Sequence, residues 1–276
     1  MGKHPTRSRP ARPSEPTARR EFVQSISRGF AVIKAFSGRP DALTISDIAQ
    51  RTGLSRAASR RFLLTLKELG YVSAEDGLFR LSPRVLDLGF TFFSTMRLPD
   101  VARSTMEQVV ATMQESCSIT VLDGMDIVYV ARVPAKRIMS ISLSVGARLP
   151  AYCTSMGRVL LAFLDQASID RYLSEVILKP LTARTVTNKE QLRHILGKVR
   201  DQGWAILDQE TEVGVRSVAA PIRDHSGRTI AAINISSHAS RATMKQIRAR
   251  FLPVLLQAAS RISDLLGAPA KNKQGS

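Results

Sequence analysis

TISDIAQRTGLSRAASRRFLLTLKELGYVSAEDGLFRL, residues 44–81, contains the signals of two short helices followed by a hairpin. Thr44, with Asp47 three residues later, resembles a capping box, which begins a helix. Gly53 lies where the chain must turn, because glycine accepts a positive φ without steric cost. Ser55 then caps a second helix. The order helix, glycine turn, helix, hairpin predicts a winged helix-turn-helix, an architecture that binds DNA.

The second of these helices is predicted to have a core face and a DNA face. Ala58, Phe62, Leu66 and Leu69 recur at helical spacing and are expected to face the core. The opposite face of the first two turns carries short or cationic groups, which suit the end of a recognition helix that enters the major groove. We expect DNA contacts from Ser46, Ser55, Arg56, Ala57, Ser59, Arg60 and Arg80.

The hairpin after the second helix is predicted to form the wing. Its strands would be Tyr71-Val72 and Leu78–Leu81, with the turn at Glu75-Asp76-Gly77 and Arg80 placed to hold a phosphate. An ordinary helical hairpin with solvated arginines is the alternative. The presence of a wing and the basic charge of the chain favour DNA binding.

The charge of the chain is strongly basic and is concentrated toward its beginning. The 276 residues carry a formal net charge of +17, with a pI of about 10.8. Residues 1–98 have a net charge of +9 and residues 99–276 of +8, so the first part has about twice the charge density. This distribution favours a polyanionic partner over a generally basic surface.

The sequence lacks the signals of a secreted or membrane protein. No apolar run reaches membrane-spanning length, and the N-terminus has no apolar signal-peptide core, so a cytoplasmic protein without membrane contact is predicted. Cys117 and Cys153 lie far apart without metal-ligand spacing. Two buried reduced thiols are favoured over a disulfide or a metal site.

The remaining sequence suggests an α+β chain of two domains and a linker. A helix over residues 22–36 carries Val23, Ile26, Phe30 and Ile33 on one side, as the first helix of the DNA-binding domain. The predicted divisions are a disordered basic tail at 1–21, the winged helix-turn-helix at 22–81, a linker and dimerisation helix at 82–98, an effector-binding domain at 99–268 and a tail at 269–276.

The linker helix is apolar around most of its circumference. Val85 and Leu88 share one face with Phe92, while Leu86 shares another with Phe90 and Phe93. Water disfavours such a helix, so one face should pack on its own domain and the other on a second subunit. An internal core helix is the alternative. Dimerisation is the favoured interpretation.

Residues 99–268 alternate between strand and helix patterns. Alternating apolar residues predict strands at 118–122, 127–133, 139–145, 204–208, 215–221 and 229–236. Helices are expected around 155–164, 169–176, 189–202 and 240–266, the last kinked by Pro253. Helices flanking a mostly antiparallel sheet make an α+β domain.

Motifs of catalysis are scarce in this domain. There is no GxSxG elbow, no glycine-rich nucleotide loop and no HExxH pair, so no catalytic residue, cofactor or metal is predicted. The histidines are scattered and lack metal-ligand spacing. Asp208, Glu210 and Glu212 cluster, and such a run favours a solvated strand end over acid–base chemistry.

Residues 148–158 are the most distinctive segment of the second domain. They form an extended stretch that enters a helix at Thr154-Ser155, and the free N–H groups of a helix start can bind a carboxylate or phosphate. Ordinary N-capping is the alternative. Asn234 and Ser236 share one strand face, and Ser217 and Asp208 add polar groups on other strands. A polar face on apolar strands must be solvated or must line a pocket.

These patterns together resemble the IclR family of bacterial transcriptional regulators over about residues 22–267. The stretches that carry the resemblance are SRGFAVIKAF at 27–36, the helix-turn-helix block quoted above, GLFRLSPRVLDLG at 77–89, GARLPAYCTSMGRVLLA at 146–162, QGWAILDQETEVGVRSVAAPI at 202–222 and AAINIS at 231–236. The runs RIMSISLSVGARLPAYCTSMGRVLLA at 137–162 and PLTARTVT at 180–187 resemble still more closely the branch that governs protocatechuate, 4-hydroxybenzoate and β-ketoadipate catabolism.

The resemblance implies a winged helix-turn-helix, a linker helix, a GAF-like effector domain and dimers that often pair into tetramers. It places a small organic acid at the start of the helix that opens at Ser155-Met156. Relatives that bind very small acids have Gly-Ala there and cysteine at Ser217, whereas Met156 can accommodate an aromatic or longer chain. The implied effector contacts are Leu149, Ser155, Met156, Asp208, Ser217, Asn234 and Ser236.

The predicted function is a transcription regulator that binds a double-stranded operator as a homodimer or a dimer of dimers. A small carboxylate effector, either an aromatic acid or a β-ketoadipate-like acid, would shift the two DNA-binding domains. An enzyme acting on a small carboxylate, with the helix-turn-helix as a fusion, is the first alternative. A nucleic-acid binder that takes no ligand is the second.

Overall fold

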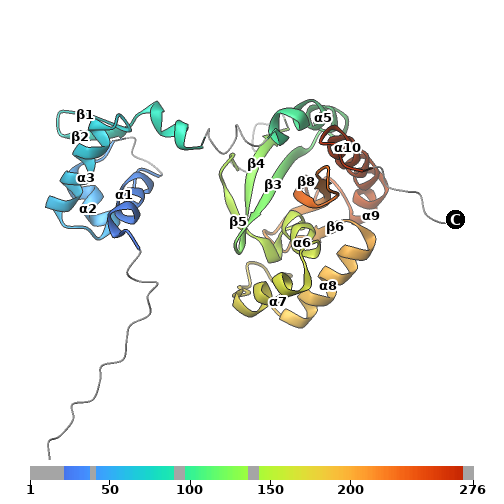
Figure 1. Ribbon diagram of the computed structural model, residues 1–276. Helices are drawn as coiled ribbons and strands as arrows, with labels where there is room; N and C mark the ends of the chain where they lie inside the picture. The colour runs from blue at the N-terminus through green and yellow to red at the C-terminus, as the bar shows by residue number, and fades with distance from the viewer. Residues whose placement is uncertain (1–21, 38–41, 90–96, 136–142, 270–276) are drawn as a thin grey trace, which may run out of the picture. The chain divides into compact units, whose positions relative to one another are not determined.

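The computed structural model describes residues 22–37, 42–89, 97–135 and 143–269. Its contacts divide the chain into two compact units, residues 1–95 and 96–276 (Figure 1). The predicted tail at 1–21 and residues 270–276 of the predicted tail at 269–276 lie outside the described residues, as do residues 90–96 of the predicted linker helix and 139–142 of a predicted strand.

The first unit has the predicted helices and hairpin. Its elements are α1 (Gln24–Lys34), α2 (Ile45–Thr52), α3 (Arg56–Glu68), β1 (Val72–Glu75) and β2 (Leu78–Leu81). The capping box at Thr44 is confirmed, because its Oγ1 accepts the Asp47 N–H while the Asp47 carboxylate accepts the Thr44 N–H at 2.8 Å. Gly53 ends α2 with a φ of +70°, as the predicted turn requires.

The wing is an antiparallel hairpin with Val72 opposite Leu81 and Glu75 opposite Leu78. Asp76 and Gly77 form its turn, with φ values of +50° and +76°, the combination that fits the twist of a two-residue hairpin. Leu43 extends the sheet by exchanging two backbone hydrogen bonds with Phe79. The predicted winged helix-turn-helix is therefore confirmed.

The apolar stripe predicted for α1 is displaced in the structure apart from Ile33, which packs against the core, whereas Phe62 and Leu66 of α3 lie against or in the core as predicted. Val23, Ile26 and Phe30 are exposed, while the core of the unit takes Val32 and Phe36 instead. The predicted buried side of α1 was based on the apolar residues of this helix alone. The side that is buried in the structure is decided by the neighbouring helices that pack on it.

Ser59 corrects the predicted DNA face of α3. It is fully buried, in line with Leu63 and Leu66 at spacings of four and three, so it cannot contact a duplex. Ser59 belongs to the core face, whereas Leu69, which was predicted for the core, is largely exposed. Serine is small enough to fit where helices approach closely. Ser59 was predicted for the DNA face because its side chain is polar.

The segment after the wing begins as predicted for the linker. Ser82 precedes a 3-10 turn at Pro83–Val85, and residues 86–89 are helical. Leu86 and Leu88 are exposed among the described residues.

The second unit is built on a six-stranded antiparallel sheet with the order β5-β4-β3-β8-β7-β6. The predicted α+β class with a mostly antiparallel sheet is confirmed. Its strands are β3 (Ser116–Asp123), β4 (Asp126–Val133), β5 (Arg148–Pro150), β6 (Ala205–Asp208), β7 (Val215–Arg223) and β8 (Thr229–His238).

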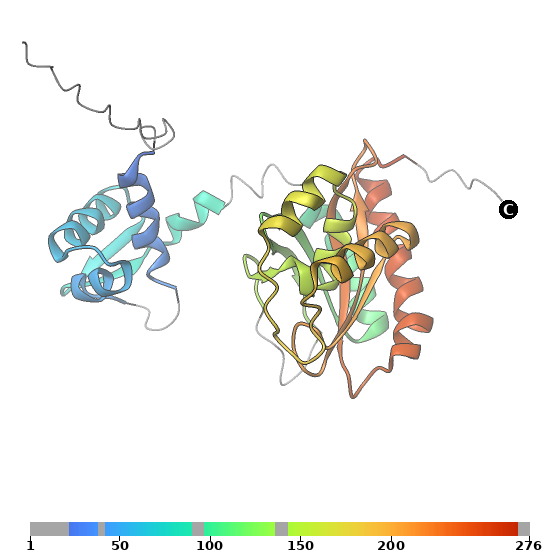
Figure 2. The ribbon, with the colours of Figure 1, turned by 90° about the horizontal axis from the view of Figure 1, so that it is seen from below.

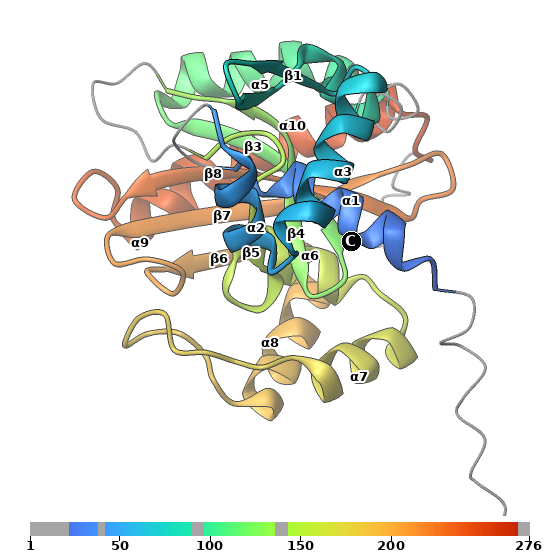
Figure 3. The same cartoon turned by 90° about the vertical axis from the view of Figure 1, so that its left-hand side faces the viewer.

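Helices cover both faces of this sheet, so the unit has three layers (Figures 2 and 3). One face packs on α5 (Leu98–Met113) and α10 (Leu252–Leu265), and the other on α6 (Ser155–Ala162), behind which lie α7 (Gln166–Glu175) and α8 (Lys189–Gln202). Alternation along β8 sends Ile233 and Ile235 to the α10 side and Asn234 to the α6 side.

Two predicted elements differ from the structure. The end of the predicted strand at 139–145 is irregular, and Val145 and Gly146 form a turn. The predicted helix at 240–266 begins only at Met244, because residues 240–243 contain a turn and the Thr243 cap. Ile247–Phe251 are π-helical directly before Pro253, which is how the chain accommodates the missing N–H of proline.

Candidate functional site

The beginning of α6 is shaped by a cap and a tight turn. Thr154 is the N-cap, and its Oγ1 accepts the Gly157 N–H at 3.1 Å. The N–H groups of a first helical turn have no carbonyl of the same helix to bond. Those of Ser155 and Met156 therefore make the start of α6 attractive to an anion.

Gly157 is required by the close approach of α6 to the turn before it. A Cβ at this position would lie 2.1 Å from the carbonyl oxygen of Ala151. Only glycine lets the 3-10 turn at Ala151–Cys153 pack this tightly against the helix that follows. The glycine thereby fixes where the first turn of α6 points.

A buried ion pair holds the same helix from the other side. The Arg158 guanidinium donates to both carboxylate oxygens of Glu210 at 2.7 and 2.6 Å, and its Nε donates to the Tyr152 carbonyl at 2.9 Å. The side chain of Arg158 is 3% exposed and that of Glu210 is 12% exposed. Glu210 is thus an anchor of α6, not the solvated strand end predicted for it.

Hydroxyl groups fix the loop that contains Glu210. Thr182 Oγ1 donates to the Gln209 carbonyl at 2.7 Å, and Thr185 Oγ1 donates to the Glu210 carbonyl at 2.6 Å. Thr211 donates to the Cys153 carbonyl. The loop after β6 is therefore tied to the turn that precedes α6.

A cavity of about 460 Å³ opens at the start of α6, against the polar part of the sheet. A volume of this size accommodates a small organic molecule. The predicted effector residues that line it are Leu149, Ser155, Met156, Ser217, Asn234 and Ser236.

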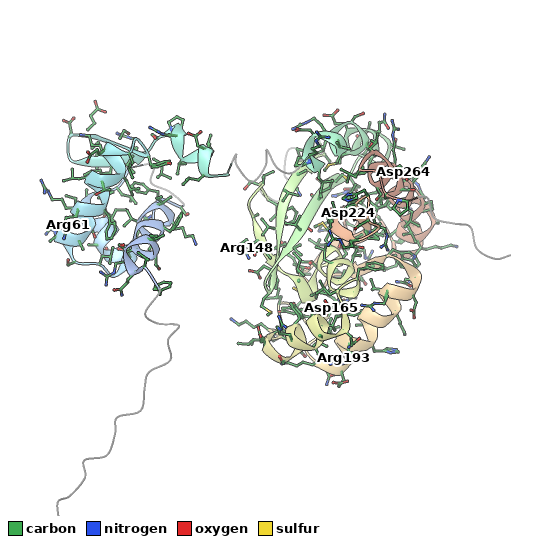
Figure 4. All side chains as sticks on the ribbon, in the orientation of Figure 1. Arg61, Arg148, Asp165, Arg193, Asp224 and Asp264 are labelled. Atoms are coloured by element: carbon green, nitrogen blue, oxygen red, sulfur yellow. The ribbon has the colours of Figure 1, made fainter. Side chains whose placement is uncertain are left out.

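Leu149 reaches this wall because β5 is clamped to the neighbouring strands. Arg148, which is labelled in Figure 4, pairs with Asp123 at 2.6 Å and with Asp126 at 3.2 Å, and these ion pairs fasten β5 beside the turn between β3 and β4.

Asp208 is not among the cavity residues, and the register of the sheet explains why. Leu207 lies opposite Ser217, so Asp208 lies opposite Arg216 on the other face of the sheet. Its carboxylate pairs with Arg216 Nε at 2.6 Å and with Arg184. Burial raises the pKa of Asp208, but hydrogen bonds led by that from Arg216 outweigh this effect and lower it overall.

Polar side chains run across three neighbouring strands on the α6 side. Arg132 of β4 lies opposite Ser118 of β3, which lies opposite Asn234 of β8. Arg132 donates to Ser118 Oγ at 3.2 Å. One row further along, Ser236 lies opposite Ser217.

Two buried polar atoms in the cavity wall lack a hydrogen-bond partner among the described residues. They are Ser155 Oγ and Asn234 Oδ1, although Asn234 Nδ2 donates to Ser236 Oγ at 2.9 Å. A buried polar atom without a partner costs free energy. Both atoms can therefore hydrogen-bond to a molecule that occupies the cavity.

Several residues of the cavity have no signal in the sequence. Tyr129 is buried beside Arg132, and burial raises the pKa of its hydroxyl to about 12, so it stays protonated as a donor. A bulge opposite Ile119 and Thr120 brings Tyr129 and Arg132 to the same face, although strict alternation along the strand would place residues 129 and 132 on opposite faces.

A second ion pair forms part of the rim. Glu115 accepts two hydrogen bonds from Arg241, both at 3.0 Å, and one from Ser237 Oγ at 2.8 Å. Residues 115 and 241 are 126 positions apart, and no local pattern could have paired them.

The predicted DNA-contacting residues of the first unit lie on its surface, with the exception of Ser59. Ser46, Ser55, Arg56, Ala57, Arg60 and Arg80 are exposed. Ser55 also caps α3, since its Oγ accepts the Ala58 N–H at 3.2 Å. Arg80 lies on the returning strand of the wing, 3.9 Å from Glu75 at a mostly exposed position.

Both cysteines are buried and unpaired, as predicted. Burial raises the pKa of Cys117 to about 12 and that of Cys153 to about 11. Among the residues that the structure describes, no group of three or more His, Cys, Asp or Glu side chains could hold a metal ion. Within the same residues, no helix has the length and apolar character needed to cross a membrane.

Comparisons with family models match both units. Residues 90–264 match the model of the bacterial transcriptional regulator IclR C-terminal domain, and residues 25–76 match the IclR helix-turn-helix domain.

Curated relatives are named as regulators. The Pca regulon regulatory protein of Pseudomonas putida is 45% identical over 86% of this chain and 82% of its own length. The p-hydroxybenzoate hydroxylase transcriptional activator of Acinetobacter baylyi is 33% identical over 92% of this chain and 95% of its own length. These names support a regulator and not an enzyme.

Solved structures that resemble this chain also belong to transcriptional regulators. A transcriptional regulator from Rhodococcus sp. RHA1 has a TM-score of 0.80 and 48% identity, covering 89% of this chain and 98% of its own. An IclR homologue from Microbacterium hydrocarbonoxydans, complexed with 4-hydroxybenzoate, has a TM-score of 0.77 and 27% identity, covering 88% of this chain and 98% of its own.

Proposed function

Because this chain belongs to the IclR family of bacterial transcriptional regulators, we propose that its DNA binding is controlled by a small hydroxylated aromatic acid. The acid would occupy the cavity at the start of α6. An acid of the β-ketoadipate type is the second candidate. Regulation of aromatic-acid catabolism in the cytoplasm, where operator DNA is found, is the corresponding cellular role.

The observation that carries this proposal is the pair of unpartnered atoms in the cavity wall, Ser155 Oγ and Asn234 Oδ1. The Ser155 hydroxyl and the N–H groups of α6 can donate to a carboxylate. Asn234 Oδ1 accepts but cannot donate, so it needs a donor such as a ring hydroxyl. A carboxylate combined with a hydroxyl satisfies both atoms, which favours hydroxybenzoates over acids without a hydroxyl.

The relatives support the same chemistry. One is named for the Pca regulon, one for p-hydroxybenzoate hydroxylase, and one related structure holds 4-hydroxybenzoate. Met156 and Leu149 give the cavity apolar wall on which an aromatic ring can pack. The family and the cavity therefore point to the same class of ligand.

Control of DNA binding would need two copies of the chain. We propose a homodimer, joined through the linker at 82–98 and able to pair into a dimer of dimers, with one α3 in each half of a pseudo-palindromic operator. Arg56 and Arg60 would contact the groove, and Arg80 would hold a backbone phosphate from the wing. Effector binding would change the relative placement of the two α3 helices.

Thermal unfolding with a panel of acids tests the ligand. The panel is benzoate, 4-hydroxybenzoate, protocatechuate, β-ketoadipate and cis,cis-muconate. We expect protocatechuate or 4-hydroxybenzoate to raise the Tm, because a ligand that binds only the native state stabilises it. Benzoate, which lacks the hydroxyl, should raise it less.

Two variants localise the effect. Ser155→Ala should weaken the binding of every carboxylate in the panel. Asn234→Leu should abolish the larger rise in Tm that 4-hydroxybenzoate gives compared with benzoate. Ser174→Ala, at an exposed position of α7 that is not among the cavity residues, is the control. A Tm that no acid moves, or a shift that both cavity variants retain in full, would reject the proposal.

A further inference from the structure

The buried side of α3 defines which residues can face a duplex. Ser59, Leu63 and Leu66 are buried. Successive residues of an α-helix advance by about 100°, so the opposite side of the helix carries Ala57, Arg61 and Leu64. All three are exposed, and Figure 4 shows Arg61 on the outer side of α3.

This outward surface combines two cations with one large apolar side chain. Arg60 and Arg61 lie beside Leu64, which is 40% exposed and is not part of the core of the unit. A single exposed leucine is common on protein surfaces and does not by itself indicate a function. Leu64 differs from such a leucine in its position, because it lies one helical turn beyond the arginines on the side of α3 away from the core.

The chemistry of the major groove gives this leucine a partner. Thymine is the base that presents a methyl group there, and apolar side chains recognise it by contact. Arginine recognises guanine by donating to O6 and N7. Three residues of helix rise by about 4.5 Å and one base step by about 3.4 Å, so Arg61 and Leu64 can reach adjacent or nearly adjacent base pairs.

We propose that Leu64 is a specificity-determining residue that contacts the C5 methyl group of a thymine, beside a base pair contacted by Arg61. The proposal rests on α3 acting as the recognition helix. It adds an apolar contact to the cationic contacts expected from Arg56 and Arg60. Each operator half-site should then contain one thymine whose methyl group matters for binding.

The first step of the test is to find the preferred sequence. Selection of duplexes from a randomised pool by the full-length protein gives a motif, and fluorescence anisotropy gives the Kd. Each thymine of the motif is then replaced by deoxyuridine, which removes only the methyl group. We expect the replacement at one position in each half-site to raise the Kd about fourfold, which is the effect of losing one buried methyl group.

The second step compares variants on the same helix. Leu64→Ala should bind the thymine and deoxyuridine duplexes equally. Leu69→Ala is the control, because Leu69, the C-cap residue of α3, is 51% exposed but does not share the outward face, and this variant should keep the fourfold difference. Circular dichroism checks that both variants fold, and Leu64→Met gives a variant that retains apolar contact.

The outcomes separate this inference from the proposal on which it rests. Loss of the methyl effect in Leu64→Ala alone supports the inference. An unchanged methyl effect in Leu64→Ala, or no thymine whose methyl group matters, overturns it while the regulator remains. If the wild-type protein selects no sequence at all, the assignment of α3 as the recognition helix is wrong.

Discussion

The ion pair between Arg158 and Glu210 allows a quantitative prediction for the ligand-binding unit. Glu210→Gln leaves a guanidinium that is 3% exposed without its carboxylate. Removing one partner of a buried pair costs roughly 3–5 kcal/mol. Arg158→Met should cost less, because the Glu210 carboxylate is more exposed and still accepts the Val186 N–H at 3.2 Å.

The double variant Arg158→Met/Glu210→Leu should be more stable than the sum of the two single changes predicts. Replacing both charges by apolar groups leaves no buried charge uncompensated, so a favourable coupling of at least about 2 kcal/mol is expected. Urea unfolding measures each free energy. Trp204 is the single tryptophan of the chain and lies in the second unit, so its fluorescence reports that unit.

Single variants that each cost less than about 1 kcal/mol, with no coupling, would contradict a stabilising role of this ion pair. That result would mean that water or another side chain compensates the remaining charge. The start of α6 would then be held by the Thr154 cap and the packing at Gly157, not by the ion pair. Effector-induced stabilisation should follow the same order as the free energies, since the pair fixes the cavity wall.

Three further perturbations follow from the structure. Burial raises the pKa of Cys153 from 9.0 to about 11, so its stabilising contribution is complete below pH 9 and is lost as the pH rises toward 11. Between pH 8 and pH 11 the wild type should therefore lose up to about 3 kcal/mol more than Cys153→Ala in urea unfolding, and equal losses would contradict this. Gly157→Ala should destabilise the second unit by about 2–3 kcal/mol and weaken acid binding, because its Cβ would meet the Ala151 carbonyl oxygen. An unchanged Tm and an unchanged acid affinity would show that the turn before α6 moves to make room for the methyl group. Thr44→Ala removes the cap of α2 and should cost about 1 kcal/mol, measured by circular dichroism on the first unit, where no loss would mean that Asp47 replaces the cap.

Local signals in the sequence were sufficient for most of the fold. The capping box at Thr44, the glycine turn at Gly53 and the alternation at Asn234 and Ser236 each depend on residues within four positions of one another. Such signals act at short range, and the structure contains all of them. The start of α6 was predicted for the same reason.

The predictions from local sequence patterns were wrong where the burial of a residue depends on distant parts of the chain. The side of α1 that bears Val23 and Ile26 is apolar but exposed, because the burial of a helix face is decided by the helices that pack on it. Ser59 is buried for the same reason. A polar residue is placed at the surface by default, and only the positions of Leu63 and Leu66 reveal the true core face.

The candidate site shows the same division. Asp208 belongs to a polar cluster in the sequence, but the pairing of β6 with β7 sends it to the far face of the sheet. Glu210, two residues later, anchors α6 through a residue 52 positions earlier. Sheet register and ion pairs between distant segments carry no local pattern.

We expect a small acid in the cavity at α6 to change the affinity of the protein for DNA. The direct measurement is the Kd for a selected operator duplex, by fluorescence anisotropy, with and without saturating 4-hydroxybenzoate or protocatechuate. We predict a change of about 5- to 150-fold for the wild type and little change for the double variant Ser155→Ala/Asn234→Leu. An acid that binds the wild type by calorimetry yet leaves its operator Kd unchanged would contradict the account.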